Sequence, residues 1–368
     1  MQNKPKILLI TLRADPGGAP LHVDNIMIGL AVKMNFYCAS PLNEPFGLKW
    51  KKTLGNNFFE MPHRKFSVTA LLGLLKFIKS NTIEIIHSHG KGAGVYSRII
   101  KIFIPKVATI HTYHGLHLPK NYLSRKFYLT YETIFTRFSD LCINVSSSEQ
   151  NKFIERGILK SNKAKVINNG IENILLKNTD SNSIKLKLNL PADKIIVICA
   201  ARLSYQKNIE ELLNIAKLFL VENHFLFIVL GDGEEKKTLE EIKSKKEISN
   251  VLFLGSKENI NEHLLASDIY LTTSRWEGLP YSLLEAARAS LPFVGSNVTG
   301  NIEVIQNNIN GFLYEAGDIL RAQECLSKLA NDKIMRREFG KASRLIFESK
   351  FVLNKMLSEI EKVYYSFI

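Results

Sequence analysis

Residues 195–207 read IIVICAARLSYQK, an apolar run that ends in a polar loop containing Arg202 and Lys207. An amphipathic stretch follows at residues 208–221. A run that is apolar throughout predicts a strand of a parallel sheet, because helices cover such a sheet on both faces. In these sheets ligands bind beyond the carboxyl ends of the strands. The segment therefore predicts a strand, a ligand-facing loop and a helix.

The same alternation of apolar and amphipathic runs extends along the chain on both sides of this segment. The predicted strands before it are residues 6–12, 35–39, 83–88, 107–112 and 141–145, with helices at 19–33, 67–79, 92–103 and 122–138. The predicted strands from it onward are residues 195–201, 225–230, 251–254, 269–273 and 293–295, with helices at 208–221, 234–246 and 281–290. Residues 170–193 are polar and predict a linker. We therefore expect two Rossmann-like α/β domains, residues 1–175 and 176–350, that face one another across a cleft.

Composition excludes several classes of protein. The 368 residues are 45% hydrophobic and 23% charged, which is typical of globular proteins and suits two domains. No apolar run reaches the roughly 20 residues of a membrane-spanning helix, and none resembles a cleavable signal. The four cysteines form no CxxC pair, so we expect buried thiols in a reducing compartment. They are Cys38, Cys142, Cys199 and Cys325. We expect a cytoplasmic protein.

Positive charge is concentrated in the first part of the chain. Residues 1–150 contain 19 Lys and Arg against 8 Asp and Glu, whereas the remainder contains 30 against 27. Basic clusters with aromatic neighbours occur at residues 49–52, 63–66 and 125–128, and Trp50 and Phe66 could enter a lipid interface. This pattern favours an anionic membrane surface as partner, with the protein peripheral at the inner face. The alternative is a set of solvated helix faces. No nucleic-acid-binding motif is present, so nucleic acid is not an expected partner.

Two features of the first domain indicate a ligand site. Gly17 and Gly18 follow the first strand and precede a helix, where the backbone can approach a ligand closely. Histidines cluster after two later strands, at residues 87–89 and 111–117. Zinc is an alternative ligand for them, although no HExxH or Cys/His spacing accompanies them. We expect one imidazole to contact a polar substrate.

The most informative motif is EGLPYSLLE at residues 277–285. Pro280 suits the first turn of a helix, which would leave the amides of Tyr281 and Ser282 available to a phosphate. Glu277 precedes this helix and Glu285 lies just over one turn along it, so the two carboxylates could reach hydroxyls at opposite ends of one ligand. Glu285 lies among apolar residues, a setting in which a carboxylate requires a partner.

In this ordered set of motifs the sequence resembles the retaining glycosyltransferases of family 4, which have the GT-B architecture. The resemblance extends over nearly the whole chain and includes the early Gly-Gly turn, residues 86–90 and 112–115, and Glu277 with Glu285. Further matching segments are residues 167–171, 201–203 with Lys207, 231–233, and Gly300, Glu303 and Gly311. Many members have Glu-Gly-Phe-Gly where this chain has Glu-Gly-Leu-Pro, which moves the expected phosphate contacts to amides after Pro280.

The resemblance implies a role for each matching residue. Glu277 would bind the hydroxyls of the donor sugar, and Glu285 those of the ribose. Arg202 and Lys207 would bind the diphosphate, with Tyr281 and Ser282 completing the donor site. The implied catalytic residues are His114, near the anomeric centre, and Glu277, with His111 as the alternative register for the histidine. Gly17 and Gly18 would lie near the diphosphate or the acceptor. The first domain would bind the acceptor, and a helix in residues 351–368 would return to it.

The resulting hypothesis is a retaining, metal-independent glycosyltransferase of hexosyltransferase type without a cofactor. It would transfer a sugar from a nucleotide-sugar donor, UDP-linked by expectation, to a glycan or lipid-linked acceptor, as in assembly of cell-surface polysaccharide or lipopolysaccharide. No Asp-x-Asp motif follows a predicted strand, so Arg202 and Lys207 would replace a metal ion at the diphosphate. Two alternatives remain open. One is a sugar-nucleotide epimerase on the same fold, and the other is a non-catalytic, sugar-nucleotide-binding subunit of a glycosylation complex.

Overall fold

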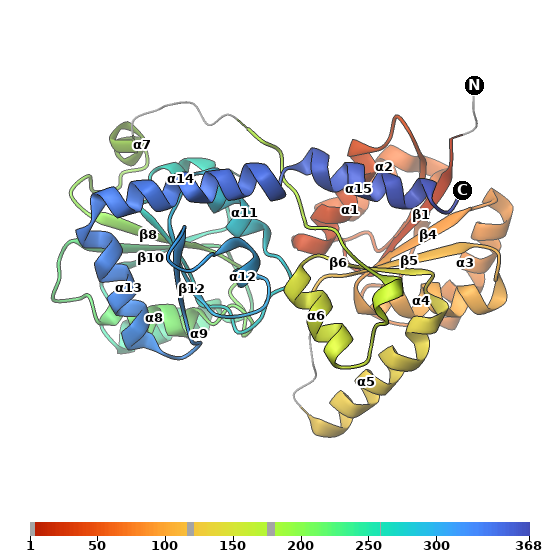
Figure 1. Ribbon diagram of the computed structural model, residues 1–368, viewed down its shortest axis with the longest axis horizontal. Helices are drawn as coiled ribbons and strands as arrows, with labels where there is room; N and C mark the ends of the chain where they lie inside the picture. The colour runs from red at the N-terminus through yellow and green to blue at the C-terminus, as the bar shows by residue number, and fades with distance from the viewer. Residues whose placement is uncertain (1–3, 116–120, 175–180, 258) are drawn as a thin grey trace. The chain divides into compact units, whose positions relative to one another are not determined.

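The computed structural model describes residues 4–115, 121–174, 181–257 and 259–368 (Figure 1). The chain divides into two compact units. Unit 1 comprises Met1–Asn169 and Leu353–Ile368, and unit 2 comprises Gly170–Val352. The cleft expected between the two domains stays a prediction. The boundary lies a few residues before the expected 175/176, and the last helix, α15 (Leu353–Tyr365), belongs to unit 1.

Unit 1 is built on a seven-stranded parallel sheet of order β3-β2-β1-β4-β5-β6-β7. Its strands are β1 (Lys6–Thr11), β2 (Asn35–Ser40), β3 (Phe58–Glu60), β4 (Ile85–His89), β5 (Ala108–Tyr113), β6 (Leu141–Asn144) and β7 (Ala164–Val166). Its α-helices besides α15 are α1 (Gly18–Gly29), α2 (Phe46–Leu54), α3 (Val68–Asn81), α4 (Gly90–Phe103), α5 (Tyr122–Phe135) and α6 (Ser147–Glu155). Short 3₁₀ helices are η1 (Gly55–Asn57), η2 (Thr136–Phe138) and η3 (Ser161–Lys163).

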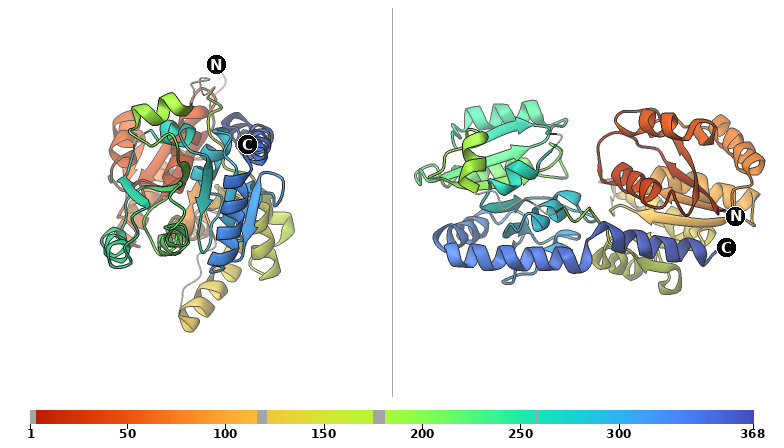
Figure 2. Two further views of the ribbon diagram at one scale, coloured as in Figure 1. Left: turned by 90° about the vertical axis from the view of Figure 1, so that its left-hand side faces the viewer. Right: turned by 90° about the horizontal axis from the view of Figure 1, so that it is seen from above.

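Side chains of β1 alternate between two cores, one on each face of the sheet. Ile7 and Leu9 pack with residues of α1 and α15, whereas Leu8 and Ile10 pack with residues of α3 and α4. This alternation follows from the two-residue period of a strand and explains why β1 is apolar throughout. Helices cover both faces of the sheet in each unit (Figure 2).

Unit 2 is built on a six-stranded parallel sheet of order β10-β9-β8-β11-β12-β13. Its strands are β8 (Ile195–Ala200), β9 (Phe225–Leu230), β10 (Val251–Gly255), β11 (Ile269–Thr272), β12 (Phe293–Ser296) and β13 (Gly311–Tyr314). Its helices are α7 (Ser181–Lys187), α8 (Ile209–Lys217), α9 (Lys236–Lys245), α10 (Asn261–Leu265), α11 (Tyr281–Arg288), α12 (Asn301–Val304), α13 (Ile319–Asn331) and α14 (Lys333–Lys350). Strand order reverses between β8 and β11, so the loops after these strands lie at the position that binds ligands in such sheets.

The fold class predicted from the sequence is confirmed: both units are Rossmann-like, and each predicted strand is present within two residues at either end. The sequence analysis missed β3, β7 and β13, which are edge strands of three or four residues. The predicted linker at residues 170–193 was wrong in part, because it contains α7. Ile184 of this helix is buried, and Lys185 donates to Asp268 at 3.1 Å, which anchors the segment to unit 2.

Three further predictions concern the burial of the cysteines, the presence of membrane-spanning helices and the exposure of Trp50. The four cysteines are buried and free, as predicted. Among the described residues no helix is long and apolar enough to cross a membrane. Trp50 was expected at the surface, and this expectation was wrong. Its side chain is fully buried and donates from Nε1 to Asp24 at 2.9 Å, because α2 turns this residue toward the core beneath α1.

Candidate functional site

In unit 2 the loops after β8 and β11 bring Lys207 and Glu277 together. Lys207 Nζ lies 2.6 Å from Glu277 Oε1. Their side chains are 17% and 6% exposed, so this ion pair is largely removed from solvent. The sequence placed both residues in the donor site but gave them separate tasks. The structure joins them, and changing either one leaves a buried charge without its main partner.

Glu277 is held by further neighbours. Ser274 Oγ donates to the same carboxylate at 2.6 Å, and Gln206 Nε2 donates to its other oxygen at 3.3 Å. Gly300 has φ of +85°, and a Cβ there would lie 2.5 Å from the carbonyl oxygen of Gly278 and 2.8 Å from Glu277 Cβ. Only glycine therefore lets this loop close over Glu277. The sequence analysis assigned no role to Ser274 or Gln206, which lack a distinctive spacing.

Arg202 has a more open environment than Lys207. Its Nε lies 3.1 Å from Glu234 Oε2, and the two side chains are 46% and 59% exposed. An ion pair in this setting is weak, so the guanidinium can exchange its partner for a ligand phosphate at little cost. The two predicted phosphate-binding cations thus differ: one is held by the buried Glu277, whereas the other has a replaceable surface partner.

Helix α11 begins at Tyr281, directly after Pro280, and no side chain caps it. This start leaves Ser282 in the first turn, where its side chain hydrogen-bonds to Tyr270 of β11. Burial raises the pKa of Glu285 to about 7, although Arg288 opposes the rise. The apolar surroundings inferred from the sequence are therefore the cause of an unusual carboxyl group one turn into α11.

In unit 1 the carboxyl ends of β4 and β5 bring together a cluster of imidazoles. Nδ1 of His89 lies 3.3 Å from Nε2 of His114. His22, from α1, packs edge-on against His114 with ring centroids 5.0 Å apart, and its Nδ1 lies 3.0 Å from Oδ1 of Asn169. His87 contacts the His89 ring at 4.2 Å between centroids. We name His22, His87, His89, His111 and His114 the histidine cluster.

Burial keeps the inner members of this cluster uncharged. It lowers the pKa of His22 to about 4 and holds the pKa of His87 and His89 well below the ordinary range, with neighbouring imidazoles adding to the effect. Burial also lowers the pKa of His111, with Arg98 as the next contributor. These four imidazoles of the cluster are therefore neutral hydrogen-bonding groups at neutral pH. The zinc alternative gains no support, since no three His, Cys, Asp or Glu of the described ranges are placed to hold a metal ion.

The structure places the two candidate histidines of β5 differently. His111 is buried within the strand, where Ser88 Oγ lies 2.9 Å from its Nδ1 and Gly94 leaves room for its ring. His114 follows the strand and is partly exposed. Of these two histidines, only His114 can therefore contact a ligand at this edge, because His111 could do so only if the core opened. His117 and the rest of residues 116–120 lie outside the described residues.

Glu149 fixes the backbone that follows His114, and the sequence analysis missed it. Its buried carboxylate accepts hydrogen bonds from the amides of Gly115 at 2.6 Å and Val145 at 3.1 Å. The signal that could have found it is the Ser-x-x-Glu pattern of a capping box, since Ser146 Oγ caps α6 by accepting from the Glu149 amide. His22 and Asn169 were also missed as site residues.

Gly17 and Gly18 form the start of α1, which no side chain caps. A Cβ at Gly17 would lie 3.0 Å from Nη2 of Arg13. Arg13 in turn forms an ion pair with Asp15 at 2.7 Å. The glycine therefore gives the guanidinium room to lie against the first turn of α1, at the carboxyl edge of the sheet.

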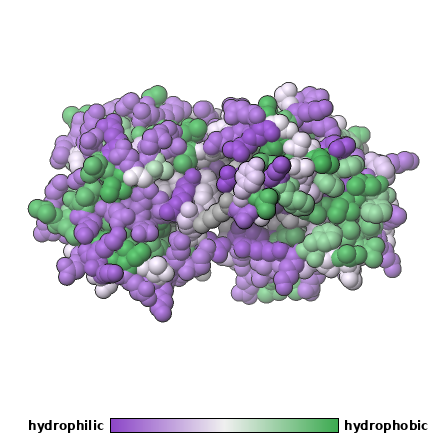
Figure 3. Space-filling view, turned by 90° about the horizontal axis from the view of Figure 1, so that it is seen from below, coloured by the Kyte–Doolittle hydropathy of each residue, from purple (hydrophilic) through white to green (hydrophobic). Residues whose placement is uncertain are grey.

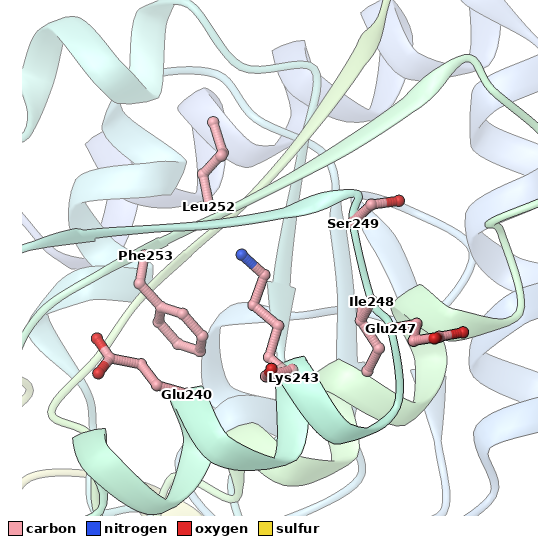
Figure 4. Close-up of a pocket in the computed structure, with 8 residues that line it drawn as sticks. Glu240, Lys243, Glu247, Ile248, Ser249, Leu252 and Phe253 are labelled. Carbon is pink, nitrogen blue, oxygen red and sulfur yellow. The ribbon is translucent and has the colours of Figure 1, made fainter.

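A surface hollow elsewhere in unit 2 does not coincide with these residues (Figure 4). Lys243 reaches up from α9 with Phe253 on one side and Ile248 on the other. The hollow extends from the last turn of α9 to the beginning of β10, near the amino end of that strand. Ligands of parallel sheets bind at the opposite edge, where Lys207 and Glu277 lie. We therefore assign the site to the carboxyl edges.

Two protein-family profiles match the chain. The profile described as Glycosyltransferase Family 4 matches residues 16–173, and the profile described as Glycosyl transferases group 1 matches residues 180–345. Together they span both units and include every predicted site residue.

Similar proteins of known name and a similar solved structure also indicate a glycosyltransferase. The UDP-Gal:alpha-D-GlcNAc-diphosphoundecaprenol alpha-1,3-galactosyltransferase of Escherichia coli is 27% identical over 308 residues, which cover 80% of this chain and 78% of the relative. The capsular polysaccharide biosynthesis glycosyltransferase CapM of Staphylococcus aureus is 25% identical and covers 81% of each chain. The structure of HepE (Alr3699) from Anabaena, in complex with UDP and glucose, superposes with a TM-score of 0.83 at 20% identity, covering 98% of this chain and 100% of that one.

Proposed function

Because the chain is a glycosyltransferase that belongs to family 4 and has the GT-B fold, we propose that it transfers a hexose from UDP to a lipid-linked or glycan acceptor with retention. The observation that carries this proposal is the buried pair of Lys207 and Glu277 at the carboxyl edge of unit 2. One relative is named for a UDP-galactose donor and a diphosphoundecaprenol-linked acceptor, and another for capsular polysaccharide, which supports a role in cell-surface polysaccharide assembly.

In the proposed reaction each unit supplies a different part of the chemistry. Arg202 and Lys207 of unit 2 bind the diphosphate and stabilise the negative charge that develops as UDP departs. Glu277 accepts hydrogen bonds from hydroxyls of the donor sugar, and Glu285 from those of the ribose. The first turn of α11, with Tyr281 and Ser282, faces the phosphates. No metal ion is required, because these cations take its place.

His114 of unit 1 is the proposed catalytic group near the anomeric carbon, and the start of α1 at Gly17 and Gly18 lies near the diphosphate or acceptor. A neutral imidazole can hydrogen-bond to a sugar hydroxyl without repelling the positive charge that develops on the sugar ring. His114→Ala should lower kcat by about 100-fold, a typical contribution of one positioned polar group. His111→Ala should instead reduce stability, since that ring is buried in the core.

The direct test is an assay of purified protein with a panel of UDP-hexoses and a short-chain prenyl-diphosphate-linked N-acetylglucosamine as acceptor. We expect one donor to give a disaccharide product with retained anomeric configuration by NMR, in the presence or absence of EDTA. An epimerase would instead interconvert the UDP-hexoses without acceptor. A binding subunit would bind UDP-hexose and produce neither transfer nor hydrolysis. Complete loss of transfer in EDTA, restored by a divalent ion, would refute the metal-independent mechanism.

We further propose that unit 1 binds the anionic inner face of a membrane through α3. The outer face of this helix exposes Val68 and Leu72 at 62% each, and the basic Lys76 and Lys79 follow them on the same stripe. Phe66, just before the helix, is 50% exposed. Hydrophobic side chains gather over one face of unit 1 in Figure 3, on the side of α3 and α4. Apolar side chains flanked by lysines are the features that bind interfaces rich in anionic lipid.

Other parts of the predicted basic surface support this proposal less well. Lys49 donates to Asp24 at 2.7 Å, and Lys51 lies 3.7 Å from Glu60. These lysines therefore already have anionic neighbours within unit 1. The predicted cluster at residues 125–128 stays exposed on α5, where Phe127 is 76% exposed beside Lys126. The surface formed by α3 and Phe66 is the one that also has the exposed Phe103, at the end of α4, beside the same sheet face.

Vesicle co-sedimentation tests the membrane proposal. Binding to phosphatidylcholine vesicles should require added phosphatidylglycerol, and it should weaken as salt is raised. Leu72→Ser and the double variant Lys76→Gln, Lys79→Gln should each reduce it. The matched control is Ile334→Ser with Lys333→Gln on α14 of unit 2, where Ile334 is also exposed. Equal recovery with neutral and anionic vesicles, or equal loss in the control, would contradict the assignment to α3.

A further inference from the structure

His89 is a buried histidine that contacts the proposed catalytic imidazole of His114 and has no assigned role in the proposed reaction. Its Nδ1 lies 3.3 Å from Nε2 of His114, and the two rings lie nearly parallel with centroids 5.6 Å apart. The His89 side chain is only 3% exposed. It cannot reach a substrate itself, so any influence on the reaction must pass through His114.

The surroundings of His89 decide which nitrogen carries its proton. The other nitrogen, Nε2, is buried and has no hydrogen-bond partner among the described residues. A buried N–H without a partner is rarer and more costly than a buried acceptor without one. Neutral His89 is therefore protonated at Nδ1 and donates to Nε2 of His114. Because a neutral imidazole carries one proton, His114 then holds its own proton on Nδ1.

The rest of the contacts keep His114 in one orientation. His22 packs edge-on against its ring, and Asn169 fixes His22 through a 3.0 Å hydrogen bond. The backbone after His114 is held by Glu149, which accepts from the amide of Gly115 at 2.6 Å. Gly115 has φ of +110°, a conformation that suits glycine and lets the chain turn at this point. The ring and the backbone of His114 are thus fixed from separate sides.

We propose that His89 is a positioning residue that fixes the ring orientation and the Nδ1-protonated tautomer of His114. This inference rests on the proposed catalytic role of His114. It assigns a task that the sequence left open to the His-x-His segment at the carboxyl end of β4. The first histidine, His87, ties β4 to α15 and β5, and the second, His89, positions His114.

Three variants separate positioning from mere support of the core. His89→Phe removes the donor but keeps a ring of similar size. His89→Asn restores an N–H near the position of Nδ1. The matched control is His87→Phe, because His87 is also buried and packs against the His89 ring but hydrogen-bonds to Tyr364 and Thr112 rather than to His114. Thermal unfolding of all three variants measures the structural cost.

We expect His89→Phe to lower kcat by about 10- to 100-fold, the scale of a misplaced reacting group, while KM for the donor changes little. His89→Asn should recover most of that loss. His87→Phe should reduce the melting temperature at least as much as His89→Phe but leave kcat near that of the wild type. Equal kcat losses in the two phenylalanine variants, or no recovery in a folded His89→Asn, would overturn the proposal.

A second measurement requires no turnover and so remains informative if the proposed reaction is wrong. Imidazole ¹⁵N shifts of the full-length protein, with His114 assigned from its absence in His114→Gln, report the tautomer directly. The wild type should show neutral His114 protonated at Nδ1, and His89→Phe should shift the proton toward Nε2. An Nε2-protonated His114 in the wild type would refute the inference. Failure of wild-type transfer with a correct tautomer would instead count against the proposed function alone.

Discussion

The two units present opposite chemistry at the carboxyl edges of similar sheets. Unit 1 places buried imidazoles there, held by Asn169, Ser88 and one another, and its ion pair of Arg13 with Asp15 lies nearer the surface. Unit 2 places paired charges there, in Lys207 with Glu277 and Arg202 with Glu234. The excess positive charge of residues 1–150 is therefore not a property of the unit 1 site. It lies partly on surface helices such as α2, α3 and α5, whereas the proposed diphosphate site belongs to the nearly neutral part of the chain.

The largest expected difference between the units is their response to acid. His22, His87, His89 and His111 have lowered pKa values in the folded state, so below about pH 6.5 the unfolded chain binds protons that the folded chain cannot. Stability is therefore lost as pH falls. Between about pH 7.5 and 5.5 the four histidines together should contribute a loss of a few kcal/mol, on the order of 1 kcal/mol each.

Unit 2 should respond much less, because its two relevant groups oppose each other. The pKa of His263 is lowered by burial, whereas that of Glu285 is raised. The chain has two tryptophans, Trp50 in unit 1 and Trp276 in unit 2. Urea unfolding of Trp276→Phe followed by fluorescence thus reports unit 1, and Trp50→Phe reports unit 2. If the free energy of unfolding depends on pH identically in the two variants, the predicted difference between the units is wrong.

The next effect should come from separating the buried charges of unit 2. Lys207→Met leaves Glu277 buried beside Ser274 and Gln206 without its cation, and should lower the free energy of unfolding by about 3 kcal/mol. Adding Glu277→Gln should restore most of that stability but not activity. The control Lys236→Met removes a partner from the exposed Asp232 and should leave the free energy of unfolding unchanged within experimental error. Additive losses in the Lys207, Glu277 double variant would show that the two side chains are not coupled.

Glu285 should give a smaller effect of the opposite sign to that of the histidines. Its folded-state pKa of about 7 lies above the ordinary value of 4.5, so it stabilises unit 2 at low pH and this contribution is lost as pH rises through 7. Glu285→Gln should therefore raise stability by about 3 kcal/mol at pH 8, and by much less near pH 5. UDP affinity should fall in the same variant if the carboxylate binds the ribose. A variant that is less stable at pH 8 would contradict the assigned cause.

Arg202 should show the smallest effect and the clearest separation of binding from stability. Arg202→Ala should weaken UDP binding by about 1.5 kcal/mol, the lower end for a charge-assisted hydrogen bond, and leave the melting temperature unchanged because its partner Glu234 is exposed. Glu234→Ala should not weaken UDP binding, since it only removes an exposed carboxylate from beside the guanidinium. If calorimetry finds an unaltered UDP affinity in Arg202→Ala, this residue does not bind the diphosphate.

The successes and failures of the sequence analysis have a common cause. Strands β1, β8 and β9 were predicted well because burial on both faces makes every position apolar, a pattern that lies within the sequence itself. The three-residue strands β3 and β7 and the helix α7 were missed because neighbouring elements hold them in place. Trp50 was misplaced for the same reason: a tryptophan between lysines is typical of a surface, and only the packing of α2 places its indole against Asp24.

The sequence by itself determined the two Rossmann-like domains, and it predicted a donor site around Glu277 and Glu285 and a group of histidines at the carboxyl ends of β4 and β5. Tertiary structure alone decided how those residues act on one another. It paired Lys207 with Glu277, which are 70 residues apart, and brought His22 and Asn169 to His114 from distant segments. Local patterns encode burial and turn geometry, whereas ion pairs and imidazole hydrogen bonds depend on distances that exist only once the sheets have formed.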